Sequence, residues 1–107
     1  MTEKQIQNSI IREFGTKGWL RIWRANVGVA RINRRVVRFG VPGQADLTGI
    51  LYDGRRVEIE IKSVTGRQTP DQKNYQQLIT RFNGIYILAR SISDVYEQLG
   101  AHGVNIA

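Results

Sequence analysis

The chain of 107 residues contains no cysteine and only one histidine, His102. Without cysteine, the protein cannot form a disulfide bond, a cysteine-ligated zinc site, an iron–sulfur cluster or a catalytic thiolate. A single histidine excludes metal sites built from several imidazoles, and it makes a Ser-His-Asp triad a poor candidate. Any catalytic chemistry must therefore come from carboxylates, lysine, arginine or amide side chains.

Long apolar stretches are also absent. No run approaches the roughly 18 apolar residues that a membrane-spanning helix needs. Residues 1–14 mix charged and amide side chains with apolar ones, which is unlike the apolar core of a signal peptide. From these features we expect a soluble, cytoplasmic protein with no membrane partner.

Acidic residues are scarce, with nine Asp and Glu against sixteen Lys and Arg. The formal net charge is +7, which favours a polyanionic partner, nucleic acid first and an anionic membrane second. Hydrophobic residues make up 41% of the chain, and its length suits one folded unit. We therefore expect a single domain over residues 1–107.

Three helices are expected. Thr2 with Gln5, and Thr69 with Gln72, have the spacing of a capping box, in which the side chains of both residues satisfy backbone donors at a helix start. The first helix should run to Gly15, and the second should run from Pro70 to Asn83-Gly84 with an apolar face of Tyr75, Leu78, Ile79 and Phe82. A short third helix, residues 94–99, is expected after Ser93.

Four strands are expected between the first two helices, and a fifth strand follows the second helix. The first four cover residues 19–32 (continuing past Gly28), 35–39, 47–51 and 56–64, and the last covers 85–89. Asn33-Arg34 is a candidate turn, and the four strands are expected in meander-like succession. This αββββαβα order predicts a mixed α/β sheet with helices packed on it.

The polar side chains of one strand are its most informative feature. Alternation in residues 57–62 places Glu58, Glu60 and Lys62 on one face. Asp46 precedes the neighbouring strand, and the connecting loop decides where it points. A two-residue loop would pair Asp46 with Ile61 and turn it away from Glu60.

A three-residue loop, Tyr52-Asp53-Gly54, would instead pair Asp46 with Glu60. Both loops suit an Asp-Gly sequence. We adopt the three-residue loop because it alone gathers Asp46, Glu60 and Lys62 on one face. The alternative is an edge strand with a solvated polar face.

Two opposed carboxylates repel each other unless a cation lies between them. Mg²⁺ or Mn²⁺ would take oxygens from Asp46, Glu60 and the backbone carbonyl of Ile61. Such a metal activates water and stabilises charge on a phosphoryl oxygen, and Lys62 would orient that water or offset that charge.

Two further residues are candidates for the same site. Glu3 lies near the centre of the face defined by Ile6, Ile10 and Phe14, where a carboxylate needs a partner, so it either reaches the metal or lies in water at a frayed first turn. Gln72 either serves only the capping box or lies beside Lys62 as a donor to metal-bound water or to phosphate.

A basic stretch separates Glu13 from Asp46, because no acidic residue lies between them. One lysine and six arginines in this stretch account for the whole net charge. Arginine binds phosphate in a bidentate manner. Trp19 and Trp23 are assigned to the core rather than to base stacking. The alternative to phosphate binding is a solvated charged face. The predicted nucleic-acid-binding residues are Arg21, Arg24, Arg31, Arg34, Arg35 and Arg38.

Taken in order, these motifs resemble the VRR-NUC branch of the PD-(D/E)XK nuclease superfamily. The matching elements are Glu3 in the first helix, Gly40-Val-Pro-Gly-Gln-Ala-Asp46, Glu60-Ile-Lys62, and Gln72 after Thr69-Pro70. One departure is Ala45, which stands where the superfamily name implies a proline. The resemblance covers nearly the whole chain and implies a restriction-endonuclease-like fold.

The resemblance also implies a Mg²⁺- or Mn²⁺-dependent deoxyribonuclease. Asp46 and Glu60 would be metal ligands, Lys62 the catalytic lysine, Glu3 an auxiliary ligand and Gln72 a positioning group. Small standalone members look like phage or bacterial homodimers that cut branched DNA such as Holliday junctions. Two other readings of the sequence stay open: a non-catalytic basic nucleic-acid-binding module, and a restriction-type nuclease.

Overall fold

The structure is a computed structural model that describes residues 1–25 and 28–106, without the side chains of residues 28–30, 38 and 39. Its elements follow one another as α1 (Glu3–Phe14), β1 (Leu20–Arg24), β2 (Gly28–Ile32), β3 (Arg35–Phe39), β4 (Leu47–Leu51), β5 (Arg56–Ile61), α2 (Pro70–Arg81), β6 (Ile85–Ala89) and α3 (Ile92–Ala101).

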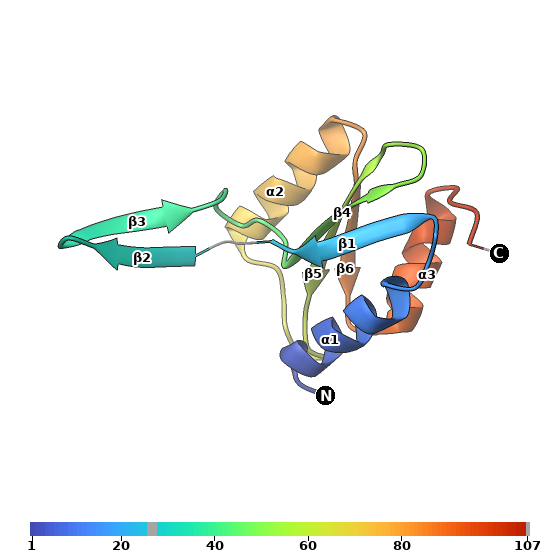
Figure 1. Cartoon of the computed structure of the whole chain (residues 1–107), viewed down its shortest axis with the longest axis horizontal. Helices are drawn as coiled ribbons and strands as arrows, with labels where there is room; N and C mark the ends of the chain where they lie inside the picture. The colour runs from blue at the N-terminus through green and yellow to red at the C-terminus, as the bar shows by residue number, and fades with distance from the viewer. Residues whose placement is uncertain (26–27, 107) are drawn as a thin grey trace.

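The central sheet has the strand order β1-β4-β5-β6. The β5–β6 pair is parallel and the other two pairs are antiparallel, so the sheet is mixed. Helices α1 and α3 lie on one face of this sheet, and α2 lies on the other (Figure 1). The prediction of a mixed α/β fold with helices packed on a sheet is confirmed.

The prediction of one strand over residues 19–32 is wrong, because the chain forms two separate strands there, β1 and β2. β1 pairs with β4, whereas β2 pairs with β3 in a sheet of their own, so the strands do not form a meander. Leu20 and Ile22 pack against the core, which binds β1 into the main sheet. Val27, part of the expected strand, lies outside the described residues.

Both predicted capping boxes are present, at Thr2–Gln5 and at Thr69–Gln72. The third helix begins earlier and is longer than expected. The hydroxyl of Ser91, and not that of Ser93, accepts the hydrogen bond from the Asp94 N–H at 3.1 Å. The longer helix buries Val95 and Leu99.

β5 ends at Ile61 instead of continuing to Val64. The Lys62 N–H still donates to the carbonyl of Ala89, the last residue of β6. Beyond Ala89 no β6 residue remains to extend the ladder, so the chain leaves the sheet there. Lys62 therefore stands at the end of the strand, where side chains from neighbouring loops and helix ends can reach it.

The main core lies between the sheet and helices α1 and α3. Ile6, Ile10 and Phe14 bury one face of α1, as predicted. Trp19 packs on this core, with its ring centroid 6.2 Å from that of Phe14, but Trp23 is 53% exposed. The expectation of a core position for Trp23 is wrong because its side chain lies on the other sheet face, which α2 covers only in part.

A smaller core lies under α2, where Tyr75 and Ile79 pack with Ala45 and Tyr86. The predicted apolar face of α2 is only half buried. Leu78 is 38% exposed and Phe82 is 76% exposed. Both side chains line a hollow between the C-terminal end of α2 and Arg56 on β5, so this part of the apolar face is not packed tightly on the sheet.

Within the described residues, none of the helices has the length and apolarity that crossing a bilayer requires.

Candidate metal and nucleic-acid site

The β4–β5 hairpin has the register that the site requires. The Leu51 N–H donates to the Arg55 carbonyl at 3.0 Å, which leaves the three-residue loop Tyr52-Asp53-Gly54. Gly54 has a φ of 91°, the left-handed conformation that glycine adopts without strain. Leu47 is paired with Ile59, and Asp46, one residue earlier, therefore lies opposite Glu60. The predicted register is confirmed.

Asp46 is fixed by the backbone of β5. Its Oδ2 accepts a hydrogen bond from the Ile61 N–H at 2.8 Å. The N–H and C=O groups of one strand residue point to the same side of the strand. The Ile61 carbonyl therefore points toward the side of β5 where the Asp46 carboxylate lies. The two groups could then bind the same cation.

Glu60 is almost completely buried, with 3% of its surface exposed. Its Oε2 accepts a hydrogen bond from Gln72 Nε2 at 3.2 Å, and Lys62 Nζ lies 3.9 Å from the same oxygen. Its other oxygen, Oε1, is buried and has no hydrogen-bond partner among the described residues. A carboxylate oxygen in this position requires either a proton or a cation.

The pKa of Glu60 is raised from 4.5 to about 8. Burial is the largest cause, and repulsion by the nearby Asp46 carboxylate comes next. Lys62 acts in the opposite direction but does not offset these two effects, and Glu3 adds a smaller repulsion. The site therefore has a shortage of positive charge.

Gln72 serves the capping box and also reaches Glu60, while its expected role as a donor to metal-bound water or to phosphate stays a prediction. Its Oε1 accepts from the Thr69 N–H at 2.9 Å, which completes the capping box, while its Nε2 donates to Glu60. The start of α2 is brought to this place by Gly43. A Cβ atom at Gly43 would lie 2.2 Å from the Asp71 carbonyl oxygen, so only glycine permits this approach.

Glu3 lies at the margin of the site. It is exposed, and its Oε2 accepts from the Ser63 N–H at 3.3 Å, just beyond the end of β5. The first turn of α1 is capped, not frayed. Glu3 is near enough to influence the pKa of Glu60, but in the described parts of the chain no three His, Cys, Asp or Glu side chains form a metal-binding group.

The donor set nevertheless suits a hard divalent cation. It consists of two carboxylates at opposed positions, one of them with an unpartnered buried oxygen, and a backbone carbonyl on the same side. Mg²⁺ and Mn²⁺ prefer oxygen ligands, and Mg²⁺ usually keeps several waters, so a few protein ligands suffice. Asp46, Glu60 and Ile61 are the residues that would hold the ion.

Glu58 and Tyr75 form a buried polar pair that sequence reasoning did not single out. Glu58 is fully buried, and its Oε1 accepts a hydrogen bond from the Tyr75 hydroxyl. Arg56 Nε lies 3.4 Å from Glu58 Oε2. Alternation did place Glu58 on the face of Glu60, but the sequence does not reveal that Tyr75 would turn a hydroxyl toward it.

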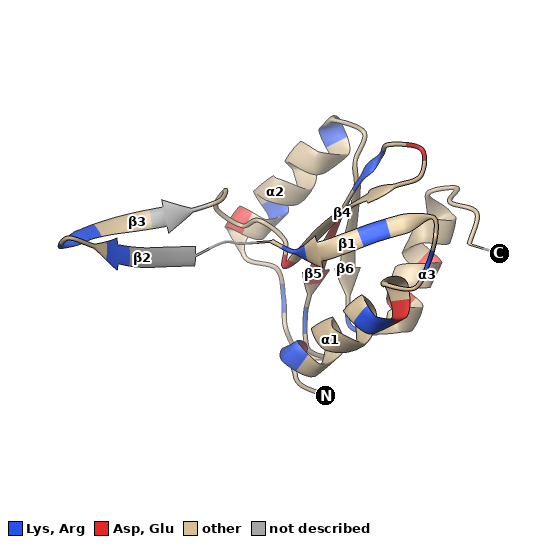
Figure 2. Ribbon diagram, in the orientation of Figure 1, with Lys and Arg blue, Asp and Glu red and all other residues tan. Residues whose placement is uncertain are grey.

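The predicted nucleic-acid-binding arginines fall into two groups. Arg21 and Arg24 lie on β1, where Arg24 donates to Asn8 Oδ1 at 2.9 Å. Arg31, Arg34 and Arg35 are exposed in the β2–β3 hairpin, whose far end is blue, the colour of basic residues, in Figure 2. The side chain of the sixth, Arg38, lies outside the described part of the structure.

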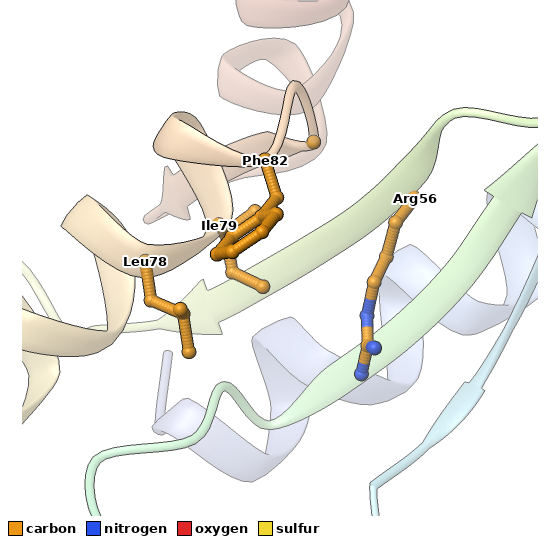
Figure 3. Close-up of a pocket in the computed structure, with 5 residues that line it drawn as sticks. Arg56, Leu78, Ile79 and Phe82 are labelled. Atoms are coloured by element: carbon orange, nitrogen blue, oxygen red, sulfur yellow. The ribbon is translucent and has the colours of Figure 1, made fainter.

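An apolar hollow beside α2 is separate from these carboxylates. A pocket of about 220 Å³ is lined by Leu78, Ile79, Phe82, Gly84 and Arg56. In the close-up, Leu78 and Ile79 of α2, and Phe82 directly after it, lie across from Arg56 on β5 (Figure 3). No site residue predicted from the sequence lines this pocket.

No known family model matches the chain, and no curated protein matches it.

Proposed function

We propose that the protein is a metal-dependent endonuclease that hydrolyses DNA phosphodiester bonds, with a restriction-endonuclease-like fold of the VRR-NUC type. The observation that carries this proposal is the meeting of Asp46, Glu60 and Lys62 at the open end of β5. A structural ion pair would not need two carboxylates at opposed positions with one oxygen unpartnered. A phosphodiesterase metal site needs that arrangement.

Each polar side chain has a defined part in this proposal. Asp46 and Glu60 would hold Mg²⁺ or Mn²⁺ together with the Ile61 carbonyl. When bound, such an ion lowers the pKa of its water and offsets charge on the phosphoryl oxygens. Lys62 places an ammonium group 3.9 Å from Glu60 Oε2, where it would position the attacking water or stabilise the pentavalent phosphorus.

Gln72 and Glu3 act on the periphery. The amide nitrogen of Gln72 holds Glu60 in one orientation through its 3.2 Å hydrogen bond. Glu3, the first residue of α1, lies near the end of β5 and would reach the ion through a water molecule. The excess positive charge between Glu13 and Asp46 would bring the DNA backbone to the site.

The substrate proposed is branched DNA such as a Holliday junction, cut by a homodimer. One domain with one site cuts one strand, so a symmetric cut of two strands needs two copies related by a two-fold axis. A comparison of four-way junction and linear duplex cleavage tests this preference. Equal rates on both substrates would favour the restriction-type alternative.

The central experiment uses purified protein with Mn²⁺ or Mg²⁺ and labelled DNA. We expect the wild type to cut, and Lys62→Ala to bind DNA without cutting. Lys73→Ala is a matched control because Lys73 is an exposed lysine on α2, outside the basic stretch, and its cutting rate should equal that of the wild type. Cutting by Lys62→Ala at the wild-type rate would refute the proposed mechanism.

A wild-type protein that binds DNA in EDTA, and that cuts neither the junction nor the duplex with either metal, would support the other candidate. The chain would then be a non-catalytic basic module, and Glu60 and Lys62 would be a structural pair.

A further inference from the structure

The β2–β3 hairpin projects from the main body as an arm (Figure 1). It forms a two-stranded sheet of its own, separate from the four-stranded sheet. Its turn consists of Asn33 and Arg34, with φ angles of 50° and 65°. Two consecutive positive φ angles are typical of a type I′ turn, whose twist matches that of the flanking strands.

The arm begins and ends beside the carboxylate site. Three residues before it, the Ala25 N–H donates to the Asp46 carbonyl at 2.9 Å. Directly after it, the loop of residues 40–46 passes Gly43 against the start of α2 and returns to Asp46. A molecule held along the arm would therefore lie next to Asp46.

Arginines are found on both faces of the arm and at its turn. Arg31 is paired with Val36, and Arg35 is paired with Ile32. Adjacent strand residues point to opposite faces, so Arg31 lies on one face and Arg35 on the other, with Arg34 in the turn. All three are exposed, and the sequence places no acidic residue between Glu13 and Asp46.

This distribution does not suit packing on a protein surface. A ribbon that lies on another protein buries one apolar face and solvates the other. Here each face combines an arginine with exposed aliphatic side chains, since Val36 is 62% exposed and Ile32 is 52% exposed. Two cationic faces fit a cleft with anionic walls on both sides, and a groove of a nucleic-acid duplex is such a cleft.

The width of the groove decides which kind of duplex could accept the arm. The major groove of B-form DNA, about 12 Å wide, admits a two-stranded ribbon, whereas the major groove of A-form RNA is too narrow for side chains to read. We propose that the β2–β3 arm enters the major groove of duplex DNA, where Arg31 and Arg35 contact phosphates on opposite walls. This deepens the proposed function and rests on DNA being the bound polymer.

The length of the arm sets where these contacts fall. A strand of five residues spans about 17 Å, which corresponds to about five base steps along one DNA strand. Because β2 begins three residues after Ala25, the phosphates held near the turn lie about five base pairs or more from the phosphate at Asp46, all on one side of the cut.

The test measures binding in EDTA, where no cleavage occurs, to a short duplex DNA and to a duplex RNA of the same sequence. Replacing Arg31, Arg34 and Arg35 together by alanine should lower the salt slope of duplex DNA binding by about 2 to 3 units, because each lost phosphate contact contributes about 0.9. The exposed Arg81→Ala is the control and should leave the slope unchanged.

Position is tested with duplex DNA that carries neutral methylphosphonates. Neutralising phosphates about five base pairs or more from the cut should weaken wild-type binding and leave the triple variant unaffected. An unchanged slope in the triple variant, or an equal loss on duplex RNA, overturns the proposal. So does a wild-type dimer that the triple variant cannot form, since the arm would then serve a second copy of the chain. Because the salt-slope comparison does not require cutting, a catalytically inert wild type would refute the nuclease and leave that comparison standing.

Discussion

Glu60 lies opposite Asp46, and only 3% of its surface is exposed. Two carboxylates so placed cannot both be ionised without a cation, because each raises the free energy of the other's charged form. The Lys62 ammonium 3.9 Å away is not sufficient, since the pKa of Glu60 still rises to about 8. In the folded protein the ionised form of Glu60 is therefore destabilised at the position where the proposed cation would bind.

The first prediction is an unusual dependence of stability on pH. In the unfolded chain Glu60 releases its proton near pH 4.5, but in the metal-free folded protein it keeps the proton until about pH 8. Between these values the folded state binds more protons than the unfolded state, so the free energy of unfolding falls as pH rises. Urea unfolding in EDTA from about pH 5 to about pH 8.5 measures this slope.

Glu60→Gln is the decisive variant for that slope. Its side chain cannot ionise but can still accept a hydrogen bond from Gln72. We expect it to be more stable than the wild type at pH 8 and to lose most of the pH dependence. A Glu60→Gln curve parallel to that of the wild type would show that Glu60 does not carry the shift.

The second prediction concerns Mn²⁺. Binding to the folded protein alone should raise the midpoint of thermal unfolding, with about 2.7 kcal/mol of stabilisation at a hundredfold excess over Kd. Asp46→Asn removes one carboxylate of the pair and should abolish this increase. Glu97→Gln changes an exposed carboxylate on α3 and should retain it. An equal increase in all three proteins would indicate nonspecific binding.

The third prediction tests the buried pair under α2. Burial, followed by the hydrogen bond with Glu58, raises the pKa of Tyr75 well above its ordinary value, so the hydroxyl remains a donor. Tyr75→Phe leaves a fully buried carboxylate with Arg56 alone and should cost about 1 to 3 kcal/mol of stability. Tyr52→Phe, at an exposed residue, should stay within about 0.5 kcal/mol in the same urea titration. Similar losses in both variants would contradict a role for the Glu58 contact.

Local chemistry explains which parts of the fold could be predicted. The capping boxes at Thr2 and Thr69 depend on residues three positions apart, and the β4–β5 register depends on a short loop ending in Gly54. The capping boxes can be predicted from neighbouring residues alone, whereas the Asp-Gly sequence allows two loops, and the choice between them rests on gathering Asp46, Glu60 and Lys62 on one face. The opposed Asp46 and Glu60 follow from that register alone, because a hairpin converts sequence spacing into spatial pairing.

Contacts between distant segments escaped prediction. The pairing of β1 with β4 skips two strands, and no local pattern indicates that Trp23 would stay 53% exposed while Trp19 packs on Phe14. Alternation put Glu58 on the right face, but its burial depends on where α2 crosses the sheet. That crossing is set by packing around Ala45 and Gly43, which a single sequence does not display.

The fourth prediction concerns Gly43, the residue at which the loop before Asp46 contacts the start of α2, the helix that carries Gln72. It has a φ of 75°, and a Cβ atom there would lie 2.2 Å from the Asp71 carbonyl oxygen. Gly54 has a φ of 91° with no atom within 4 Å of an added Cβ. Both alanine variants meet the left-handed strain of about 1 to 2 kcal/mol, but only Gly43→Ala must also displace backbone.

We therefore expect Gly43→Ala to lose about 1 to 3 kcal/mol more stability than Gly54→Ala in urea unfolding. Displacing the start of α2 also moves Gln72 away from Glu60, because the 3.2 Å hydrogen bond between them spans the contact that Gly43 permits. Gly43→Ala should then bind Mn²⁺ more weakly than Gly54→Ala, as measured by calorimetry on folded protein. If the two variants lose equal stability and bind Mn²⁺ equally, the close approach at Gly43 does not set the geometry of the site.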